Sequence, residues 1–208
     1  MRVEIRKKWD LPLEQKAALA VLSAAFLLGG LLGCLLAALS SGTGAEELSS
    51  YLTGYLALAR EGGIPRGLWP LLWGQVKYAL AVLVLGLTAL GLAGVPILFG
   101  LRGFFFSFSA ACFCRVFGKR GLLPAFFLFG LPALLWVPAL FLSGVPGFLS
   151  ARQLLRRTSG DGRSVIPLNG AWWCRAGLCV GLALLSGLLE YWVVPVLLRA
   201  AARVILSS

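Results

Sequence analysis

The residue whose type most invites chemistry is Glu190, a carboxylate within the apolar run SGLLEYWVVPVLL from Ser186 to Leu198. A charge inside a membrane segment costs about 2.5–3.5 kcal/mol at the helix centre, and it usually faces other helices or pairs with an opposite charge. Arg115, near the outer end of another apolar segment, is expected at a similar depth. We therefore predict an ion pair between Glu190 and Arg115. The alternative is that Glu190 is protonated or hydrated from the nearby surface while Arg115 extends to the lipid headgroups.

Residue patterns typical of catalysis are missing from the sequence. The chain has no histidine and eight acidic residues, of which Glu190 alone falls within a predicted span. Zinc sites of the usual histidine-containing types and histidine acid–base chemistry are thereby excluded. The five cysteines lie in or beside apolar runs without a CxxC pair, which predicts buried thiols. The sequence therefore predicts no enzyme activity, no catalytic residue, no cofactor and no metal ion.

The composition is that of a membrane protein. Hydrophobic residues make up 59% of the 208 residues and charged residues only 13%, which is far more apolar than a soluble domain. Apolar runs of about 20 residues recur, each long enough to cross roughly 30 Å of hydrocarbon. The net charge of +11 is concentrated beside these runs, as expected for topology signals and lipid contacts rather than for nucleic-acid binding. We predict an all-α, polytopic helix bundle forming a single integral membrane domain over residues 1–208.

The apolar runs and their basic flanks predict five spans and their orientation. The cytoplasmic parts are a basic tail, 1–16, and a basic loop, 150–175, while segment 40–77 and the C-terminus lie outside. The first run is longer than a cleaved signal, so we interpret it as a retained anchor. A surface helix is expected at about 48–59. The predicted spans are 17–39, 78–101, 103–117, 122–149 and 176–198.

Two of these spans are unusual. Segment 103–117 is short, and only Arg102 and Gly103 are available to form the turn between it and the second span. We favour a full crossing, because a re-entrant segment would place the arginine-rich loop outside. Four prolines interrupt the fourth span, which is therefore expected to be kinked. In the first span, Gly29 and Gly33 form a GxxxG pair that favours packing within the bundle, with a homo-oligomer left open.

In their order along the chain, these segments resemble the stage II sporulation protein M family of endospore-forming bacteria. The resemblance covers nearly the whole chain, from the basic tail to LLEYWVVPVLL. Its most specific motifs are short groups of residues that contain glycine or proline, together with the glutamate of the last span. The residues concerned are Gly94 and Pro96, followed by Leu101-Arg102-Gly103, then Leu131-Pro132 and Pro138, and finally Glu190 with Pro195.

The resemblance implies a role in engulfment, in which the mother-cell membrane migrates around the forespore. Such a protein would be a non-enzymatic scaffold or anchor in that membrane, with its N-terminus in the cytoplasm. Its partners would be the peptidoglycan-degrading stage II sporulation proteins D and P. The structural or docking candidates are Glu190, Arg115, Pro195, Gly94, Pro96, Gly103, Pro132 and Pro138. A transport or channel subunit with Glu190 lining a pathway is the alternative function, and an intramembrane enzyme is disfavoured.

Overall fold

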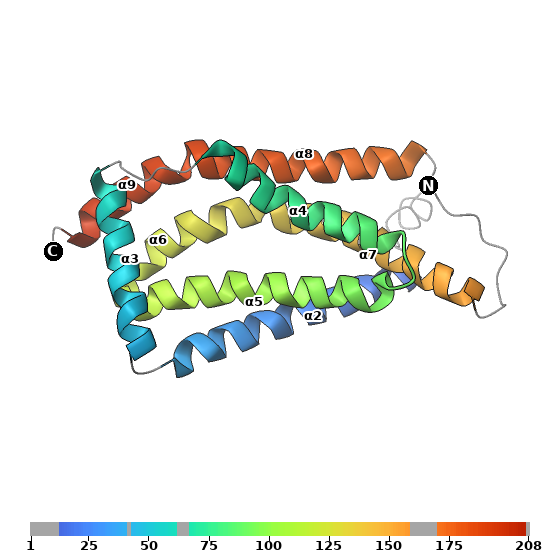
Figure 1. Cartoon of the computed structure of the whole chain (residues 1–208), viewed down its shortest axis with the longest axis horizontal. Coiled ribbons are helices and arrows are strands. Elements are labelled where there is room, and N and C mark those ends of the chain that lie inside the picture. The colour runs from blue at the N-terminus through green and yellow to red at the C-terminus, as the bar shows by residue number, and fades with distance from the viewer. Residues whose placement is uncertain (1–12, 41–42, 62–66, 159–169, 207–208) are drawn as a thin grey trace, which may run out of the picture.

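The computed structural model describes residues 13–40, 43–61, 67–158 and 170–206 (Figure 1). Within these ranges the chain forms helices and short turns and no strand. The helices are α2 (Leu13–Leu39), α3 (Thr43–Glu61), α4 (Leu68–Gly86), α5 (Gly91–Phe117), the 3-10 turn η1 (Gly118–Gly121), α6 (Leu122–Ala125), the π-helical turn η2 (Phe126–Gly130), α7 (Leu131–Thr158), α8 (Gly170–Trp192) and α9 (Val194–Leu206).

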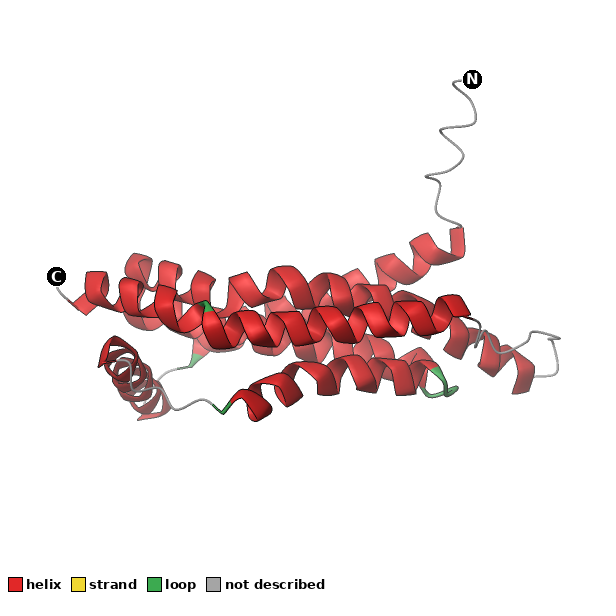
Figure 2. Ribbon diagram, turned by 90° about the horizontal axis from the view of Figure 1, so that it is seen from above, coloured by secondary structure: helices red, strands yellow, loops and turns green. Residues whose placement is uncertain are grey.

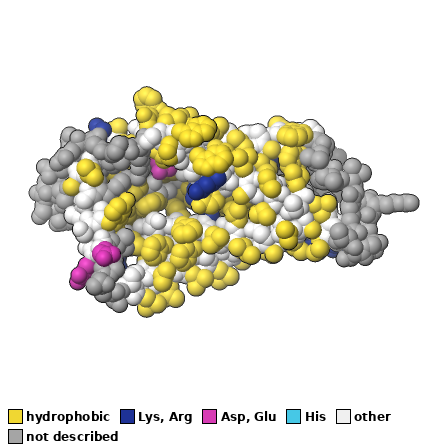
Figure 3. Space-filling view, in the orientation of Figure 1, with side chains coloured by type: hydrophobic (Ala, Val, Ile, Leu, Met, Phe, Trp, Pro, Cys, Tyr) yellow, Lys and Arg dark blue, Asp and Glu magenta, His cyan; other side chains and the backbone are white. Residues whose placement is uncertain are grey.

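Five helical segments are long and apolar enough to cross a membrane, which confirms the predicted polytopic helix bundle. They run side by side along the long axis of the molecule, with the start of α2 and the end of α9 at opposite ends of the bundle (Figure 1). Hydrophobic side chains cover much of the middle of the face seen in Figure 3, as a lipid-facing surface requires. The five segments are Leu13–Leu39, Leu68–Gly86, Gly91–Phe117, Leu122–Arg156 and Trp172–Ala200.

The boundary between the second and third spans differs from the prediction. The turn lies at residues 87–90, and α5 continues without a break from Gly91 to Phe117. The predicted turn at Arg102 and Gly103 is therefore wrong, and the third span is not a short segment. A cation is costly inside a span, which is why Arg102 suggested a turn. The structure instead places Arg102 near the middle of α5.

The fourth span is interrupted as expected, and the interruption is a π-helical turn. The segment η2 lies between α6 and α7, and Figure 1 shows the helical path bending there. Such turns are a recognised cause of helix kinks. Pro138 and Pro146 lie inside α7. Side chains of α8 donate hydrogen bonds to the backbone of α7, from Ser186 to Pro132 and from Cys179 to Ala139, each at 3.0 Å.

Glycines bring α2 and α5 into backbone contact. A Cβ atom added at Gly29 would overlap the backbone of Gly100, and one added at Gly33 would overlap the backbone at Phe104. The same holds for Gly103 against the backbone of Phe26. Small residues allow this close approach in lipid, where packing drives helix association. The GxxxG pair of α2 thus packs inside the bundle, as predicted.

Helix α3 lies across one end of the bundle, nearly perpendicular to the spans, and is seen almost end-on in Figure 2. It includes the predicted surface helix and is longer than predicted. Its buried Leu52 joins a hydrophobic cluster with Val194 and Leu198 of α9 and with Cys112 and Phe113 of α5. Burial of apolar area of this kind fixes α3 on the bundle.

Candidate functional site

Three polar side chains from three different spans meet inside the bundle. The guanidinium of Arg102, on α5, donates to the side-chain oxygen of Gln75, on α4, at 2.6 Å. The side-chain nitrogen of Gln75 in turn donates to the carboxylate of Glu190, on α8, at 3.0 Å. We call these three residues the polar network. It links a cation to an anion through one neutral amide.

Glutamine has the chemistry that this bridge requires. A guanidinium only donates hydrogen bonds and an ionised carboxylate only accepts them, whereas a primary amide does both. The oxygen of Gln75 therefore faces Arg102 and its NH2 group faces Glu190. Bonds to charged partners are shorter and stronger than neutral ones. Together, Arg102 and Glu190 balance their charges within the membrane-spanning part of the protein.

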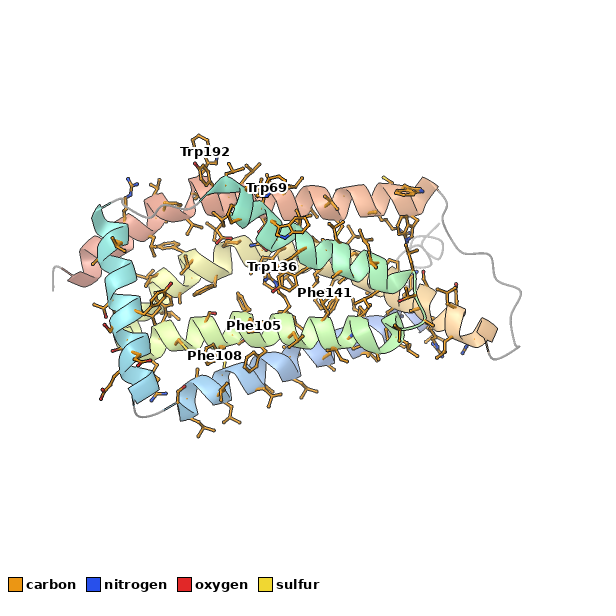
Figure 4. The ribbon with its side chains drawn as sticks, viewed as in Figure 1. Trp69, Phe105, Phe108, Trp136, Phe141 and Trp192 are labelled. Carbon is orange, nitrogen blue, oxygen red and sulfur yellow. The ribbon has the colours of Figure 1, made fainter. Side chains whose placement is uncertain are left out.

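Two aromatic rings contact the guanidinium of Arg102. Its central carbon lies 4.3 Å from the ring centroid of Tyr78 and 4.3 Å from that of Trp136. Trp136 comes from α7, is only 7% exposed, and appears between α4 and α5 in Figure 4. The negative face of an aromatic ring attracts a cation, with a contribution of about 2 kcal/mol when the pair is desolvated. These contacts explain how a span accommodates Arg102.

The polar network lines a cavity of about 200 Å³. This volume is below the range of about 300–1,000 Å³ typical of small-molecule sites. The described residues contain no group of three His, Cys, Asp or Glu side chains placed to hold a metal ion. The arrangement is suited to joining helices through charge and hydrogen bonds. The lining residues are Gln75, Arg102, Phe105, Phe106, Ser109, Leu128, Phe129, Pro132, Trp136 and Glu190.

Arg115 has a different role from the one predicted. Its guanidinium donates to the backbone carbonyls of Ala37 and Ala38, at the last turn of α2. Carbonyls at a helix C-terminus lack intrahelical donors, and a cation there also opposes the negative end of the helix dipole. The predicted Glu190–Arg115 pair is therefore wrong. Glu190 is linked through Gln75 to Arg102 instead, and Arg115 caps α2.

The remaining predicted residues are spread over three helices. Pro132 lies on the wall of the same cavity as Glu190. Gly94, Pro96 and Gly103 belong to α5, and Pro138 belongs to α7. Pro195 is the second residue of α9, directly after the break at residue 193 that ends α8, so the bend expected there is present (Figure 1). The structure thus brings Glu190 and Pro132 to the cavity but places the others elsewhere.

Sequence reasoning missed Gln75, the bridging member of the polar network, and also missed Tyr78 and Trp136, the two rings that contact Arg102. The predicted topology puts Gln75 in an extramembrane segment, although α4 already begins at Leu68. Tyr78 and Trp136 are not distinguished from other aromatic residues by any sequence pattern. The signal in the sequence is the presence of two opposite charges in apolar surroundings, Arg102 and Glu190, each of which requires a polar partner.

The fold and the polar network define a polytopic helical membrane protein whose spans are joined by internal charge and hydrogen bonds. A family model described as stage II sporulation protein M matches residues 22–195, which is most of the chain and includes the whole network. The chain belongs to the stage II sporulation protein M family. This is a family of sporulation membrane proteins and not a known enzyme family. Comparisons with curated proteins and with solved structures gave no match.

Proposed function

We propose that this protein is a non-enzymatic scaffold in the cell membrane that holds peptidoglycan-degrading partners during engulfment. The observation that carries the proposal is the placement of α3. Leu52 fixes one side of this helix to the bundle, while Tyr51, which is 70% exposed, and Leu58, which is 51% exposed, share another face, roughly 100–120° around the helix from Leu52. Tyrosine is enriched at protein interfaces. A helix held in this way offers a firm docking surface.

Charge at the two ends of the bundle supports an orientation with α3 outside. One end of the bundle is where α2 begins, α7 ends and α8 begins. The basic residues described there are Lys16, Arg152, Arg156 and Arg175. Arg115, Lys119 and Arg199 belong to the α3 end, where α3 also carries exposed acidic side chains. Cytoplasmic segments are enriched in Lys and Arg. The first end is then cytoplasmic, and α3 faces the compartment that contains peptidoglycan.

The partners in this proposal are stage II sporulation proteins D and P, which act on peptidoglycan outside the membrane. Family membership supports the sporulation context, and the membrane would be the engulfing membrane of the mother cell. The polar network has a structural role in this account. By joining α4, α5 and α8 it stabilises the bundle on which α3 is mounted.

Co-purification from sporulating cells tests the proposal. Proteins D and P are quantified after pull-down of the tagged full-length chain, either wild type or with Tyr51→Ala and Leu58→Ala together. We expect about a tenfold lower yield of partners from the variant, equivalent to about 1.4 kcal/mol of binding. Leu27→Ala is the matched control, because Leu27 is 64% exposed on the lipid-facing side of α2. Wild-type yields from the α3 variant would contradict the proposed docking surface.

A transport or channel subunit is the second candidate function. It is favoured by one observation, namely that Glu190 and Arg102 lie on the wall of an intramembrane cavity. Charged residues in spans often mark ion or substrate pathways. The small volume of the cavity and the bond between Glu190 and Gln75 support the scaffold instead. Solute flux into liposomes that Glu190→Gln abolishes would decide for transport.

A further inference from the structure

A second cavity lies at the opposite end of the bundle from α3. Its volume is about 390 Å³, within the range of about 300–1,000 Å³ typical of ligand sites. One face of α7 forms most of its wall, with Gln15 contributed by α2 and Arg175 by α8. We call it the α2–α7–α8 groove. The α7 residues on its wall are Phe141, Leu142, Val145, Pro146, Leu149, Ser150 and Gln153.

The wall changes from apolar to polar along the groove. The α7 positions recur every three or four residues, so they lie on one face of the helix. The apolar positions, from Phe141 to Leu149, come first, and Ser150 and Gln153 follow toward the end of α7 at Thr158. Gln15 and Arg175 lie close to the first residues of their own helices. The polar groups are thus gathered at the membrane-surface end, and the apolar wall extends toward the bilayer interior.

The polar end of the groove carries positive charge. Arg175 is on the wall, and Arg152 and Arg156 flank Gln153 on α7. Glu14 precedes Gln15 but is exposed and does not line the groove. Among the described residues, Glu14 is the one acid at this end of the bundle.

A tryptophan pair lies beside this charged end. The rings of Trp172 and Trp173, in the first turn of α8, make an edge-to-face contact with centroids 5.0 Å apart. Tryptophan is typical of the bilayer interface, so Arg175, only two residues further along α8, lies at headgroup depth. The α2–α7–α8 groove therefore combines a cationic mouth at the interface with an apolar interior.

We propose that the α2–α7–α8 groove binds one anionic phospholipid, with an acyl chain along the apolar face of α7 and the phosphate at Arg175, Gln153 and Gln15. Basic pockets between transmembrane helices are recognised sites for anionic lipid headgroups. The apolar-to-polar order of the wall matches the order of chain and headgroup in a lipid. The positive mouth selects anionic over zwitterionic lipids. This site is separate from the scaffold surface on α3, and its existence does not depend on that function.

Native mass spectrometry of the purified full-length chain tests this site. The protein is titrated with phosphatidylglycerol and, in parallel, with phosphatidylethanolamine carrying the same acyl chains. We expect one phosphatidylglycerol molecule to bind at least fivefold more tightly, since each basic residue near the surface contributes about 1 kcal/mol. Arg175→Gln should weaken phosphatidylglycerol binding about fivefold and leave phosphatidylethanolamine binding unchanged. Arg199→Gln, which removes an exposed arginine of α9, is the matched control and should have no effect.

A second variant tests the apolar part of the groove. Leu149→Trp adds bulk to the wall and should reduce binding of both lipids, whereas the charge variant affects only phosphatidylglycerol. Equal affinity of the wild-type protein for the two lipids would overturn the proposal. Unchanged phosphatidylglycerol binding in Arg175→Gln would overturn it as well. Inorganic phosphate that competes as well as the lipid would show that an anion site, and not a lipid site, is present.

Discussion

The side-chain amide of Gln75 donates a hydrogen bond of 3.0 Å to the carboxylate of Glu190, although the two residues are 115 positions apart in the sequence. The same amide accepts from Arg102 at 2.6 Å. One neutral side chain therefore connects three spans and links two opposite charges. Glu190 is held by this network, and its role in the structure is to join helices.

Replacing Gln75 with leucine should destabilise the bundle. Gln75→Leu removes the two hydrogen bonds through which its amide joins Arg102 to Glu190, and the loss of hydrogen bonds to charged groups is costly. We expect the free energy of unfolding in detergent to fall by about 1–2 kcal/mol, near the upper end measured for hydrogen bonds in membranes. Ser50→Leu, at an exposed position of α3, is the control and should change stability by less than about 0.5 kcal/mol. Equal effects of the two substitutions would argue against a bridging role.

Double-mutant cycles distinguish the observed partner of Glu190 from the predicted one. Leucine substitutions at Arg102 and Glu190 should be non-additive, with a coupling energy of about 1 kcal/mol, because both side chains belong to one network. The same cycle for Arg115 and Glu190 should be additive within about 0.5 kcal/mol, since Arg115 bonds to α2. Thermal or denaturant unfolding of the purified variants provides both values. The reverse pattern would restore the Glu190–Arg115 pair.

Glycine substitutions test the close packing of α2 and α5. In Gly29→Ala the new methyl group would overlap the backbone of Gly100, so we expect a loss of about 1–3 kcal/mol. A methyl group added at Gly177 of α8 would meet no neighbouring helix within 4 Å. Gly177→Ala should therefore keep or raise stability, because alanine is the better helix former by roughly 0.5–1 kcal/mol. Melting temperatures that fall equally in both variants would contradict the packing described.

The number of spans could be predicted from sequence because apolar length alone determines whether a helix can cross a bilayer. The turn at residues 87–90 could not, since LTAL itself contains no proline, glycine or charge, and glycines such as the flanking Gly86 and Gly91 recur throughout the spans. Its polar groups are satisfied locally, by bonds such as Thr88 N to Leu85 O at 3.0 Å and the Thr88 hydroxyl to the same carbonyl at 3.0 Å. Hydropathy does not distinguish such a turn from a continuous span.

The candidate site is only partly predictable from the sequence, because the sequence shows its charged residues but not the neutral residue that joins them. Glu190 can be identified because a carboxylate in an apolar run needs a partner. A turn placed at Arg102 puts that residue at the cytoplasmic surface instead of inside a span, and Arg115 then remains as the cation at a suitable depth. The observed partner, Gln75, is uncharged and distant in sequence, so no periodic or charge pattern indicates it. Its role becomes visible only when α4, α5 and α8 are packed together.

The scaffold proposal is tested most directly by site-specific photocrosslinking in sporulating cells. A photoreactive amino acid replaces Tyr51 on the exposed side of α3 or, as control, Leu27 on the lipid-facing side of α2; the two native residues are 70% and 64% exposed. The account predicts that position 51 crosslinks to stage II sporulation protein D or P and that position 27 does not. Absence of both partners from the crosslinks at position 51, with the protein present at wild-type levels, would contradict it.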